Sequence, residues 1–532
     1  MGTLHPKNAK QKQRLLTAEH WVCVERARYY TEVHRETVGL HPSLRAARAL
    51  TNVFAKMTVR IEPDELLVGN RSSKLIALPI APERGDFTFV FEHLFDQLKE
   101  FGYRIEPADE RVLFDELIPY WKGKTVRDAK IAAFEDHHLA SRLNLSPVEI
   151  RRKLRSFGIR ALVKLVVDDA PAKDPLGRVK RAGRLAARLP RLLRAVQAGA
   201  GDNLKGRGRC TDTQAHIVLG HKNVLRLGFS GIQAAARARR ASAQSDGERA
   251  FLESVELSCE AMRAFSERFA TLARAQAAAC PDAERRQELA AIADTCSRVP
   301  WLPPRTFVEA VQSLWFTQNA AIISYGAGSG ITPGRVDQLL FPYFAADLAR
   351  GTLSREHALR LLEELVIKLN NNVIIWPNIG GVRLNHLGSD VENITLGGVD
   401  AHGDDATNAL SSLFVEAISH TNLATTASFR ISQKSPKDFV RQVVAMHRTT
   451  NSPAFLNDET VIAAMVRDGY AVEDARQYCL VGCVEPSGNG DTYGATGGSK
   501  IYFPTALDLV STGARPPSSA TRTGGTPETR PR

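Results

Sequence analysis

The feature that most constrains the fold is an alternation of helix-like and strand-like segments in the second half of the chain. Apolar residues repeat at helical spacing over 354–369, and short apolar runs follow at 373–376, 394–399 and 426–431. Further helical patterns separate and follow the last two runs. Strands that alternate with helices at this spacing predict an α/β body with parallel strands rather than a β-sandwich. Such a body offers a crevice or a barrel interior for chemistry.

The first 300 residues are mainly helical in pattern and predict a scaffold for this body. Apolar residues recur every three or four positions over 19–36, 43–56, 86–101 and 248–278. Pro303-Pro304 is expected to open a further, buried helix, with proline in its first turn. Asp404 or Asp405 is expected to cap the helix that carries Leu410 and Phe414. We therefore expect one large body rather than several small domains.

Composition excludes several other classes of protein. With 43% hydrophobic and 24% charged residues, the 532-residue chain is typical of a globular protein. The first twelve residues are polar, and no apolar stretch reaches the roughly 18 residues of a membrane span, so we expect a cytoplasmic protein without a transmembrane segment. Its seven cysteines are too irregularly spaced for a disulfide framework or a zinc site, which predicts reduced thiols and no bound metal.

The net charge of +12 comes largely from one segment, 176–209, in which ten Lys or Arg face the single acid Asp202. Its apolar residues recur at roughly helical spacing and are interrupted at Pro190. This pattern favours a solvated insertion packed by one face, and contact with an anionic membrane or nucleic acid is the alternative. The segment lacks the interleaved aromatic residues that single-strand binding favours, so we expect no nucleic-acid partner.

A cysteine and a glutamate follow an apolar strand near the end of the chain. The strand is predicted at 478–481, and the proline and glycines of 482–491 predict a tight turn or loop that carries Cys483 and Glu485. A thiol and a nearby carboxylate could serve thiolate chemistry or hydrogen-atom chemistry, and the spacing does not decide between them. Thiolate chemistry would need a cation or histidine beside the sulfur, and the local sequence holds none. An inert buried thiol is the bland alternative, but the surrounding glycines are not typical of a core.

The pentapeptide Gly482-Cys483-Val484-Glu485-Pro486 resembles the cysteine loop of the glycyl radical enzymes, the pyruvate formate-lyase-like family, in its dehydratase, lyase and decarboxylase branch. Further stretches match the family in the same order along the chain, from about residue 15 to 510: Asp64-Glu65-Leu66-Leu67-Val68-Gly69-Asn70, 299–312, Gly334-Arg335-Val336-Asp337-Gln338, Thr395-Leu396-Gly397-Gly398-Val399-Asp400 and Pro453-Ala454-Phe455-Leu456-Asn457-Asp458-Glu459.

The resemblance implies a ten-stranded α/β barrel made of two half-barrels, with the cysteine loop at its centre. It implies that a glycyl radical, installed by a radical S-adenosylmethionine activating enzyme, withdraws a hydrogen atom from Cys483. The thiyl radical would then abstract hydrogen from a small-molecule substrate, and Glu485 would deprotonate a neighbouring hydroxyl so that a leaving group departs. His216 matches a family position that can contact substrate hydroxyls, with a surface histidine as the alternative. Arg335 and Asp337 are expected to brace a loop rather than to touch the substrate.

Departures from the family pattern bear on the subclass. Gly482 stands where pyruvate formate-lyase has a second adjacent cysteine, which disfavours acetyl transfer. Residues 494–498 lack the acidic residue of the diol and choline branch, which puts glycerol or propanediol dehydration in doubt. The sequence contains no Arg-Val-x-Gly-Tyr-like segment to carry the radical, and Gly469-Tyr470 lies upstream of the cysteine in a helix-ending context.

We therefore expect an incomplete ten-stranded barrel in a catalytic domain over 1–510, with the helical scaffold to about 300, the barrel portion after it and a disordered tail at 511–532. The first hypothesis is a glycyl radical lyase body, inactive alone, that needs the activating enzyme and a second chain bearing the glycyl radical. The second is a non-catalytic remnant or partner-binding protein that keeps the fold. The resemblance leaves open a homodimer, and it leaves open whether the reaction is dehydration, C–N or C–S cleavage, or decarboxylation.

Overall fold

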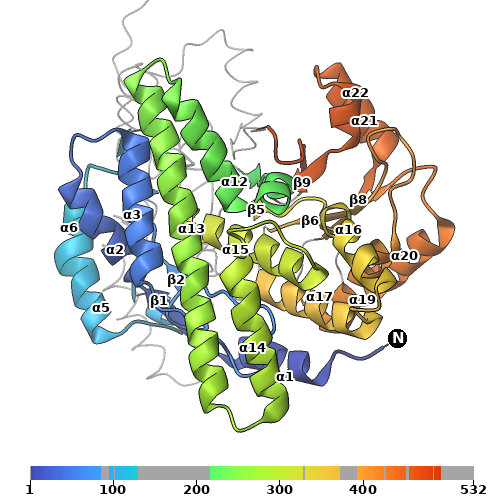
Figure 1. Ribbon diagram of the computed structural model, residues 1–532, viewed down its shortest axis with the longest axis horizontal. Helices are drawn as coiled ribbons and strands as arrows, with labels where there is room; N and C mark the ends of the chain where they lie inside the picture. The colour runs from blue at the N-terminus through green and yellow to red at the C-terminus, as the bar shows by residue number, and fades with distance from the viewer. Residues whose placement is uncertain are drawn as a thin grey trace, which may run out of the picture.

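Figure 1 shows the protein as a computed structural model. The structure describes residues 2–84, 91, 95–96, 98–100, 102–126, 128–129, 216–326, 330–371, 392–423, 427–450, 454–482 and 484–492. The basic segment at 176–209, the strand predicted at 373–376, the tail at 511–532 and most of the helix predicted at 86–101 lie outside these residues.

The N-terminal part is a helical scaffold around a small sheet (Figure 1). Its shorter helices are α1 (Pro6–Thr17), α2 (Glu25–Glu36), α3 (Pro42–Lys56), the 3₁₀ turn η1 (Pro82–Arg84), α5 (Pro107–Arg111), the π-helical η2 (Val112–Leu117) and α6 (Ile118–Trp121). The longer helices that follow are α12 (His221–Ala241), α13 (Asp246–Ala279) and α14 (Ala283–Arg298). The predictions of helices at 43–56 and 248–278 are confirmed.

The helix predicted at 19–36 is wrong at its start. Residues His20–Cys23 form strand β1, which pairs in parallel with β2 (Ile76–Pro79) and with β3 (Tyr103–Arg104). The helix α2 begins only at Glu25. A four-residue apolar run has no period that separates strand from helix, so the choice is made by the partner strands, which lie more than 50 residues away.

The second part of the chain alternates helices with short parallel strands, as predicted. Its elements are β4 (Ile217–Val218), α15 (Phe307–Tyr325), β5 (Ile331–Thr332), α16 (Val336–Ala349), α17 (Arg355–Leu369), β6 (Ile394–Gly397), α19 (Ala409–Thr421), β7 (Ala427–Ile431), α20 (Lys437–Thr450), β8 (Ala454–Asn457), α21 (Asp458–Arg467), α22 (Val472–Arg476), β9 (Cys479–Val481) and β10 (Glu485–Ser487).

Strands β4 to β8 form one row of parallel strands in chain order. β4 pairs with β5, and β6 pairs with β7, which pairs with β8. A bridge between Gly334 and Ile394 joins the two groups, and the Thr395 amide donates to the Gly334 carbonyl at 3.0 Å. Within the described residues the row does not close on itself. This confirms the prediction of an incomplete α/β barrel behind a helical scaffold.

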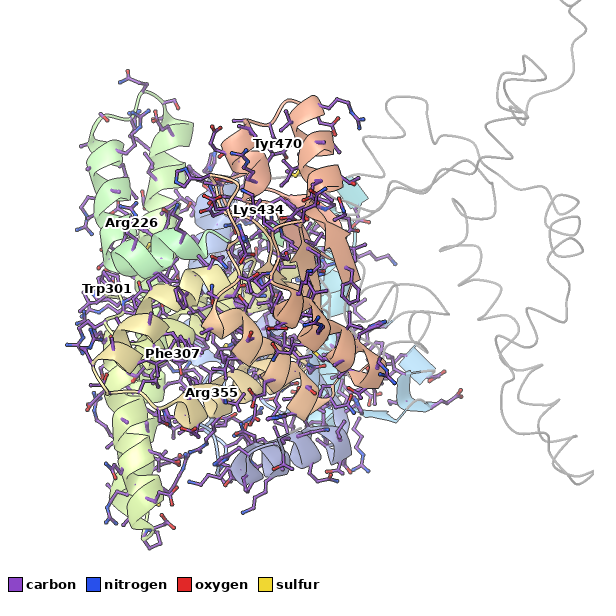
Figure 2. The ribbon with its side chains drawn as sticks, turned by 90° about the vertical axis from the view of Figure 1, so that its right-hand side faces the viewer. Arg226, Trp301, Phe307, Arg355, Lys434 and Tyr470 are labelled. Atoms are coloured by element: carbon purple, nitrogen blue, oxygen red, sulfur yellow. The ribbon has the colours of Figure 1, made fainter. Side chains whose placement is uncertain are left out.

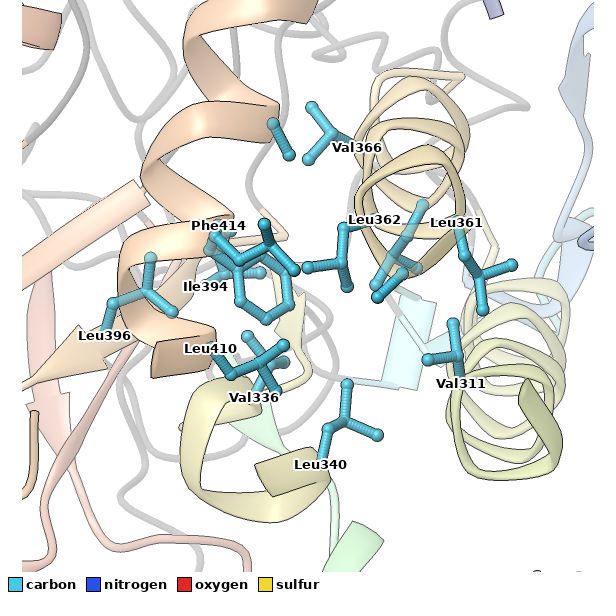
Figure 3. Close-up of a cluster of buried hydrophobic side chains, with 14 of the residues drawn as sticks. Val311, Val336, Leu340, Leu361, Leu362, Val366, Ile394, Leu396, Leu410 and Phe414 are labelled. Carbon is cyan, nitrogen blue, oxygen red and sulfur yellow. The ribbon is translucent and has the colours of Figure 1, made fainter. Parts of the chain in front are cut away.

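A large apolar core lies between the strands and the helices that cover them. Figure 3 shows Phe414 of α19 close to Ile394 of β6, with Leu362 of α17 beside them, and Val311 of α15 facing Leu361 of α17. All five side chains are buried. At roughly 25 cal/mol per Å² of buried apolar surface, such a core is the main stabilising contribution to this part of the fold.

Two helices begin later than the sequence pattern predicts. Thr306, not the Pro303-Pro304 pair, caps α15, because its hydroxyl accepts the Glu309 amide at 3.2 Å. The cap of α19 is Asn408 and not Asp404 or Asp405, because its side-chain Oδ1 atom accepts the Leu410 amide at 2.9 Å. In both cases several residues nearby could serve as a cap, and the tertiary packing selects one of them.

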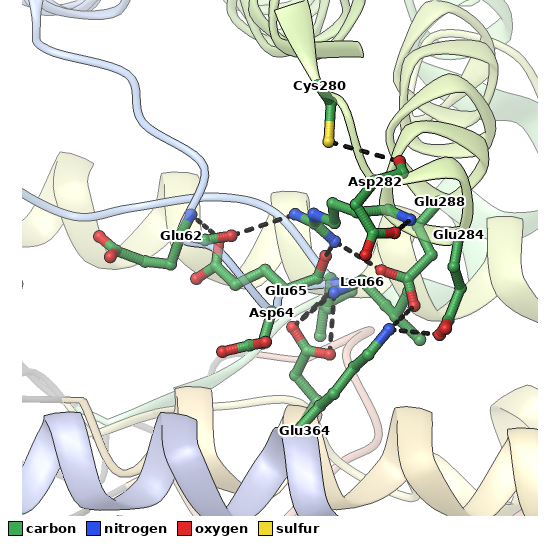
Figure 4. Close-up of polar contacts among 12 residues, drawn as sticks. Glu62, Asp64, Glu65, Leu66, Cys280, Asp282, Glu284, Glu288 and Glu364 are labelled. Carbon is green, nitrogen blue, oxygen red and sulfur yellow. Dashed lines mark hydrogen bonds and ion pairs between the residues drawn. The ribbon is translucent and has the colours of Figure 1, made fainter.

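Ion pairs and buried carboxylates join the scaffold to α17 (Figure 4). Glu288 of α14 pairs with Lys7 of α1 and with Arg360 of α17, both at 2.9 Å. Burial alone would raise the pKa of Glu288, but hydrogen bonds from Lys7, Arg285 and Arg360 lower it to about 2. Glu364 of α17 accepts the amides of Leu66 and Leu67 at 3.0 Å, and its burial raises its pKa to about 7.

Figure 2 shows a side view of the molecule. Toward one end lie Tyr470, between α21 and α22, and Arg226 of α12, and toward the other end lies Arg355, at the start of α17.

Among the described helices, none combines the length and the apolar character that a membrane crossing requires.

Candidate active site

The predicted strand and the residues after it form a small antiparallel hairpin. β9 and β10 pair with the register Val481↔Glu485, Leu480↔Pro486 and Cys479↔Ser487. The segment after Val481 was predicted to be a turn or loop throughout, so the short strand β10 is a correction, and its cause is this pairing with β9. β9 in turn lies against β4, β5 and β6. Three residues, 482–484, connect the two strands.

Cys483 lies outside the described residues, but both of its neighbours are described. Gly482 is buried and has φ 55°, a left-handed conformation that favours glycine. Val484 has 47% of its surface exposed. The connection therefore begins at a buried residue, Gly482, and ends at an exposed one, Val484.

His216 lies directly against the start of this connection. A Cβ atom added to Gly482 would be 2.3 Å from the Cδ2 atom of His216, and one added to Gly330 would be 1.9 Å from its Nδ1 atom. The imidazole thus fills the space that two glycines leave open. Since His216 precedes β4 and Gly330 precedes β5, the tip of the hairpin meets the amino-terminal ends of these strands. The structure therefore places His216 next to Gly482, at the start of the connection between β9 and β10.

Glu485 lies on the other side of the connection. Its Oε2 atom accepts a hydrogen bond from the Val484 amide at 3.0 Å, and its side chain is half-buried. The carboxylate is thus turned toward the backbone of the residue that follows Cys483. Glu485 and His216 thus contact Val484 and Gly482, the two residues on either side of Cys483.

A buried ion pair anchors the chain where it enters the hairpin. Arg430 of β7 donates to both oxygens of Asp458, at 2.9 and 2.8 Å. The same guanidinium donates to the carbonyls of Tyr478 and Arg476 at 2.9 and 2.8 Å, and the Tyr478 hydroxyl donates to Asp458 at 2.8 Å. Because Arg430 and Asp458 are 0% and 1% exposed, this charge-assisted network is shielded from water and fixes the base of β9.

Arg335 and Asp337 brace a loop, as predicted. The Arg335 guanidinium donates to the Gly397 carbonyl and the Asp337 carboxylate accepts the Gly397 amide, both at 2.8 Å. Burial, with the nearby Arg430 charge, lowers the pKa of Arg335 to about 10, and burial raises the pKa of Asp337. Both residues hold the end of β6 in place beneath the hairpin.

Cys479 is a structural thiol. It is fully buried, and its Sγ atom donates to the Gly488 carbonyl at 3.4 Å across the hairpin. Burial raises the pKa of Cys479 to about 12, although Arg335 and Arg430 oppose this shift. It therefore stays a neutral thiol at physiological pH. Cys23, Cys259, Cys280 and Cys296 are also free thiols.

Four residues that support the hairpin were not singled out from the sequence: Thr332, Thr395, Arg430 and Asp458. Two of them lie in stretches that carry the family resemblance, Thr395 at the start of 395–400 and Asp458 within 453–459. Their role could not be inferred because each acts on a residue far away in the chain. In the part of the chain that the structure describes, no group of three or more His, Cys, Asp or Glu could hold a metal ion.

Comparison with known proteins agrees with this geometry. The family model described as pyruvate formate lyase-like matches residues 6–146 and 202–531. The interruption between 146 and 202 contains most of the basic segment at 176–209, as expected for an insertion.

Similar curated proteins and solved structures are glycyl radical enzymes or act as lyases and dehydratases. An isethionate sulfite-lyase from Nitratidesulfovibrio vulgaris is 30% identical over 92% of this chain and 54% of its own length. A (2S)-3-sulfopropanediol dehydratase from Klebsiella oxytoca is 27% identical over 98% of this chain and 57% of its own length. A solved structure concerned with 1,2-propanediol dehydration in Roseburia inulinivorans has a TM-score of 0.77 at 26% identity and covers 96% of this chain and 57% of its own. The chain thus spans little more than half the length of these relatives.

Proposed function

This chain belongs to the pyruvate formate lyase-like family, and we propose that it is the body of a glycyl radical lyase that uses Cys483 and Glu485. The observation that supports the proposal is the hairpin geometry: of the two residues that flank Cys483, Gly482 lies against the imidazole of His216 and Val484 donates to the carboxylate of Glu485. A sulfur atom, a base and a hydrogen-bonding group are the parts that radical elimination from a hydroxylated small molecule needs.

The proposed chemistry uses the residues of this chain as follows. A glycyl radical, installed by a radical S-adenosylmethionine activating enzyme, would serve as the acceptor of the hydrogen atom of the Cys483 thiol, and the elimination itself is redox-neutral. The Cys483 sulfur gives up its hydrogen atom and then takes one from a substrate carbon. Glu485 accepts the proton of the neighbouring hydroxyl while a leaving group departs, and His216 orients that hydroxyl. The product radical regains a hydrogen atom from the Cys483 thiol, so that atoms and electrons balance over one cycle.

The reaction class follows the relatives only in outline. Their names describe sulfite release, dehydration and, for a shorter match, indoleacetate decarboxylation. We propose elimination of water, an amine or sulfite from a small hydroxylated substrate, with decarboxylation as the variant that uses the same sulfur. The chain spans 54–57% of the length of the two curated relatives. We propose the complete reaction for an assembly that also contains the radical glycine, whether that glycine lies on the same polypeptide or on another one.

The exposed strand β8 supports the proposal that the described row continues with a further segment. The inner strand β7 is almost entirely buried, whereas β8 alternates half-buried and exposed residues. Among the described strands, none pairs with the outer edge of β8. A parallel strand is normally covered on both faces, so β8 fits a neighbouring segment beyond those that the structure describes.

The test is electron paramagnetic resonance after anaerobic incubation with the activating enzyme and the C-terminal part of a relative. We expect an organic radical signal together with turnover of a hydroxylated substrate such as isethionate or (2S)-3-sulfopropanediol, which the names of the two relatives suggest. Cys483→Ala is expected to keep the signal and abolish turnover, since the radical site and the sulfur are separate. Glu485→Gln should reduce turnover by about 10²–10⁴-fold, the usual contribution of a general base.

A non-catalytic remnant or partner-binding protein that keeps the fold is the second candidate, and the observation that favours it is the partly exposed strand β8. It predicts that the chain binds a partner through the β8 edge but gives neither radical nor turnover in the same incubation. Turnover that survives Cys483→Ala would exclude both candidates as stated here.

A further inference from the structure

We propose that Thr332 and Thr395 are positioning residues, whose hydroxyls clamp Leu480 and thereby hold the cysteine loop in place. The Thr332 hydroxyl donates to the Leu480 carbonyl at 3.1 Å, and the Leu480 amide donates to the Thr395 hydroxyl at 3.0 Å. The three side chains are 0% exposed. This assignment rests on the role proposed for Cys483, which lies three residues after Leu480 in the sequence.

The need for the clamp follows from the register of the hairpin. In an antiparallel pair, residues alternate between positions that exchange backbone hydrogen bonds and positions whose N–H and C=O point away from the partner. Leu480 is opposite Pro486, which has no amide hydrogen to give. The N–H and C=O of Leu480 therefore point away from β10 and need partners elsewhere.

Those partners come from two different strands of the parallel row. Thr332 ends β5, and Thr395 is the second residue of β6. β5 and β6 are joined to each other through the bridge between Gly334 and Ile394. The hairpin does not join the row by a ladder of its own, and instead two side-chain hydroxyls reach its central peptide groups, one from each strand.

The hydroxyl group is what the position requires. Valine has nearly the same shape as threonine, but it would leave a buried amide or carbonyl of Leu480 without a partner, which is strongly unfavourable. Loss of either bond should therefore let β9 move away from the row. The consequence would appear at the tip, where Gly482 packs against His216 with no space to spare.

The experiment compares Thr332→Val, Thr395→Val and the matching serine variants in the full chain. Two rates are measured without any radical: hydrogen exchange of the peptide that contains the Leu480 amide, and alkylation of Cys483 by iodoacetamide, resolved by fragment mass spectrometry. We expect each valine variant to raise both rates about tenfold, as the loss of one buried hydrogen bond implies. The serine variants keep the hydroxyl and should stay within about threefold of the wild type. Cys479 lies on the same tryptic peptide and is a slow internal reference, because it is buried.

Thr421→Val is the matched control. Thr421 is also 0% exposed, and its hydroxyl donates to Ile418 within α19, away from the hairpin. A purely structural role for Thr332 and Thr395 predicts that Thr421→Val changes the Cys483 alkylation rate to the same degree, and that result overturns the proposal. So do valine variants whose two rates stay within about twofold of the wild type.

If a valine variant fails to fold, the wild-type chain still tests the clamp. The Leu480 amide should exchange much more slowly than the Val484 amide, which is exposed at the loop, and equal rates overturn the proposal. These readouts are independent of the radical. A negative resonance experiment with a positive clamp result rejects the proposed function alone, and the reverse outcome rejects the clamp alone.

Discussion

Strands β7 and β8 are neighbours in one parallel sheet, yet they differ in how they are covered. Phe429 of β7 and Phe455 of β8 are partners in the register, and their side chains are 0% and 44% exposed. The next pair, Arg430 and Leu456, shows that β7 also serves the hairpin, because Arg430 carries the buried contacts that anchor β9. β7 is therefore covered on both faces, and β8 is not.

The difference shows which strand of the sheet is covered on both faces and which strand is exposed. Inner strands of a parallel sheet are normally buried on both faces, and an exposed apolar edge invites pairing with another chain. Other exposed apolar residues lie on the helices next to this edge, Val444 of α20 at 46% and Val466 of α21 at 41%. Within the described residues, the sheet is therefore covered at β7 and exposed at β8.

The largest effect that we expect comes from removing the charge at the centre of β7. Arg430→Ala would leave Asp458 buried without its cation and remove two hydrogen bonds to backbone carbonyls. Removing one partner of a buried ion pair should lower the free energy of unfolding by about 4 kcal/mol, measured by urea denaturation.

Arg441→Ala is the control for that substitution. Arg441 pairs with Asp438 on the surface of α20, where the two side chains are 74% and 93% exposed. Exposed pairs of this kind contribute little, so the urea midpoint should not change. Equal midpoints for Arg430→Ala and Arg441→Ala would show that the inner strand is no better covered than the surface.

The second prediction tests the register partners directly. Phe429→Ala removes a fully buried ring and should lower the free energy of unfolding by about 3 kcal/mol, through lost burial and the cavity that remains. Phe455→Ala removes a ring that is already 44% exposed and should cost less than about 1 kcal/mol. The two urea curves form a matched pair, since the same atoms are deleted from adjacent strands. If the costs are equal, β8 is covered to the same extent as β7, and the proposed opening at this edge is wrong.

The sequence alone predicted the parallel strands of the buried body, but it did not predict all of the element types or the helix caps. The alternation after Ser354 indicated parallel strands, because periodicity records which faces are buried. It could not indicate that residues 20–23 form a strand or that Thr306 and Asn408 are the caps, since those choices depend on packing.

The candidate site divides in the same way. Cys483 and Glu485 were found because they lie two residues apart in a distinctive loop. Thr332, Thr395 and Arg430 support that loop from positions that are 148, 85 and 48 residues away from their contacts in the hairpin region. No local pattern records such contacts, so they became visible only in the fold.

The smallest effect that we expect concerns Glu364, through which helix α17 contacts the N-terminal scaffold. Burial raises the pKa of Glu364 from 4.5 to about 7, against the opposing charge of Lys368, so the folded protein holds a proton that the unfolded chain releases. Its contribution to stability is complete below pH 4.5 and is lost as the pH rises through 7.

Glu364→Gln mimics the protonated form and should remove this loss. Relative to the variant, the wild type should lose about 2 kcal/mol of unfolding free energy between pH 4.5 and 7.5, measured by urea titrations at several pH values. Glu363→Gln, which changes the neighbouring carboxylate beside His420, is the control for the position. A difference between wild type and Glu364→Gln that does not change with pH would mean that water reaches this carboxylate, and the α17 side would then be as open as the edge at β8.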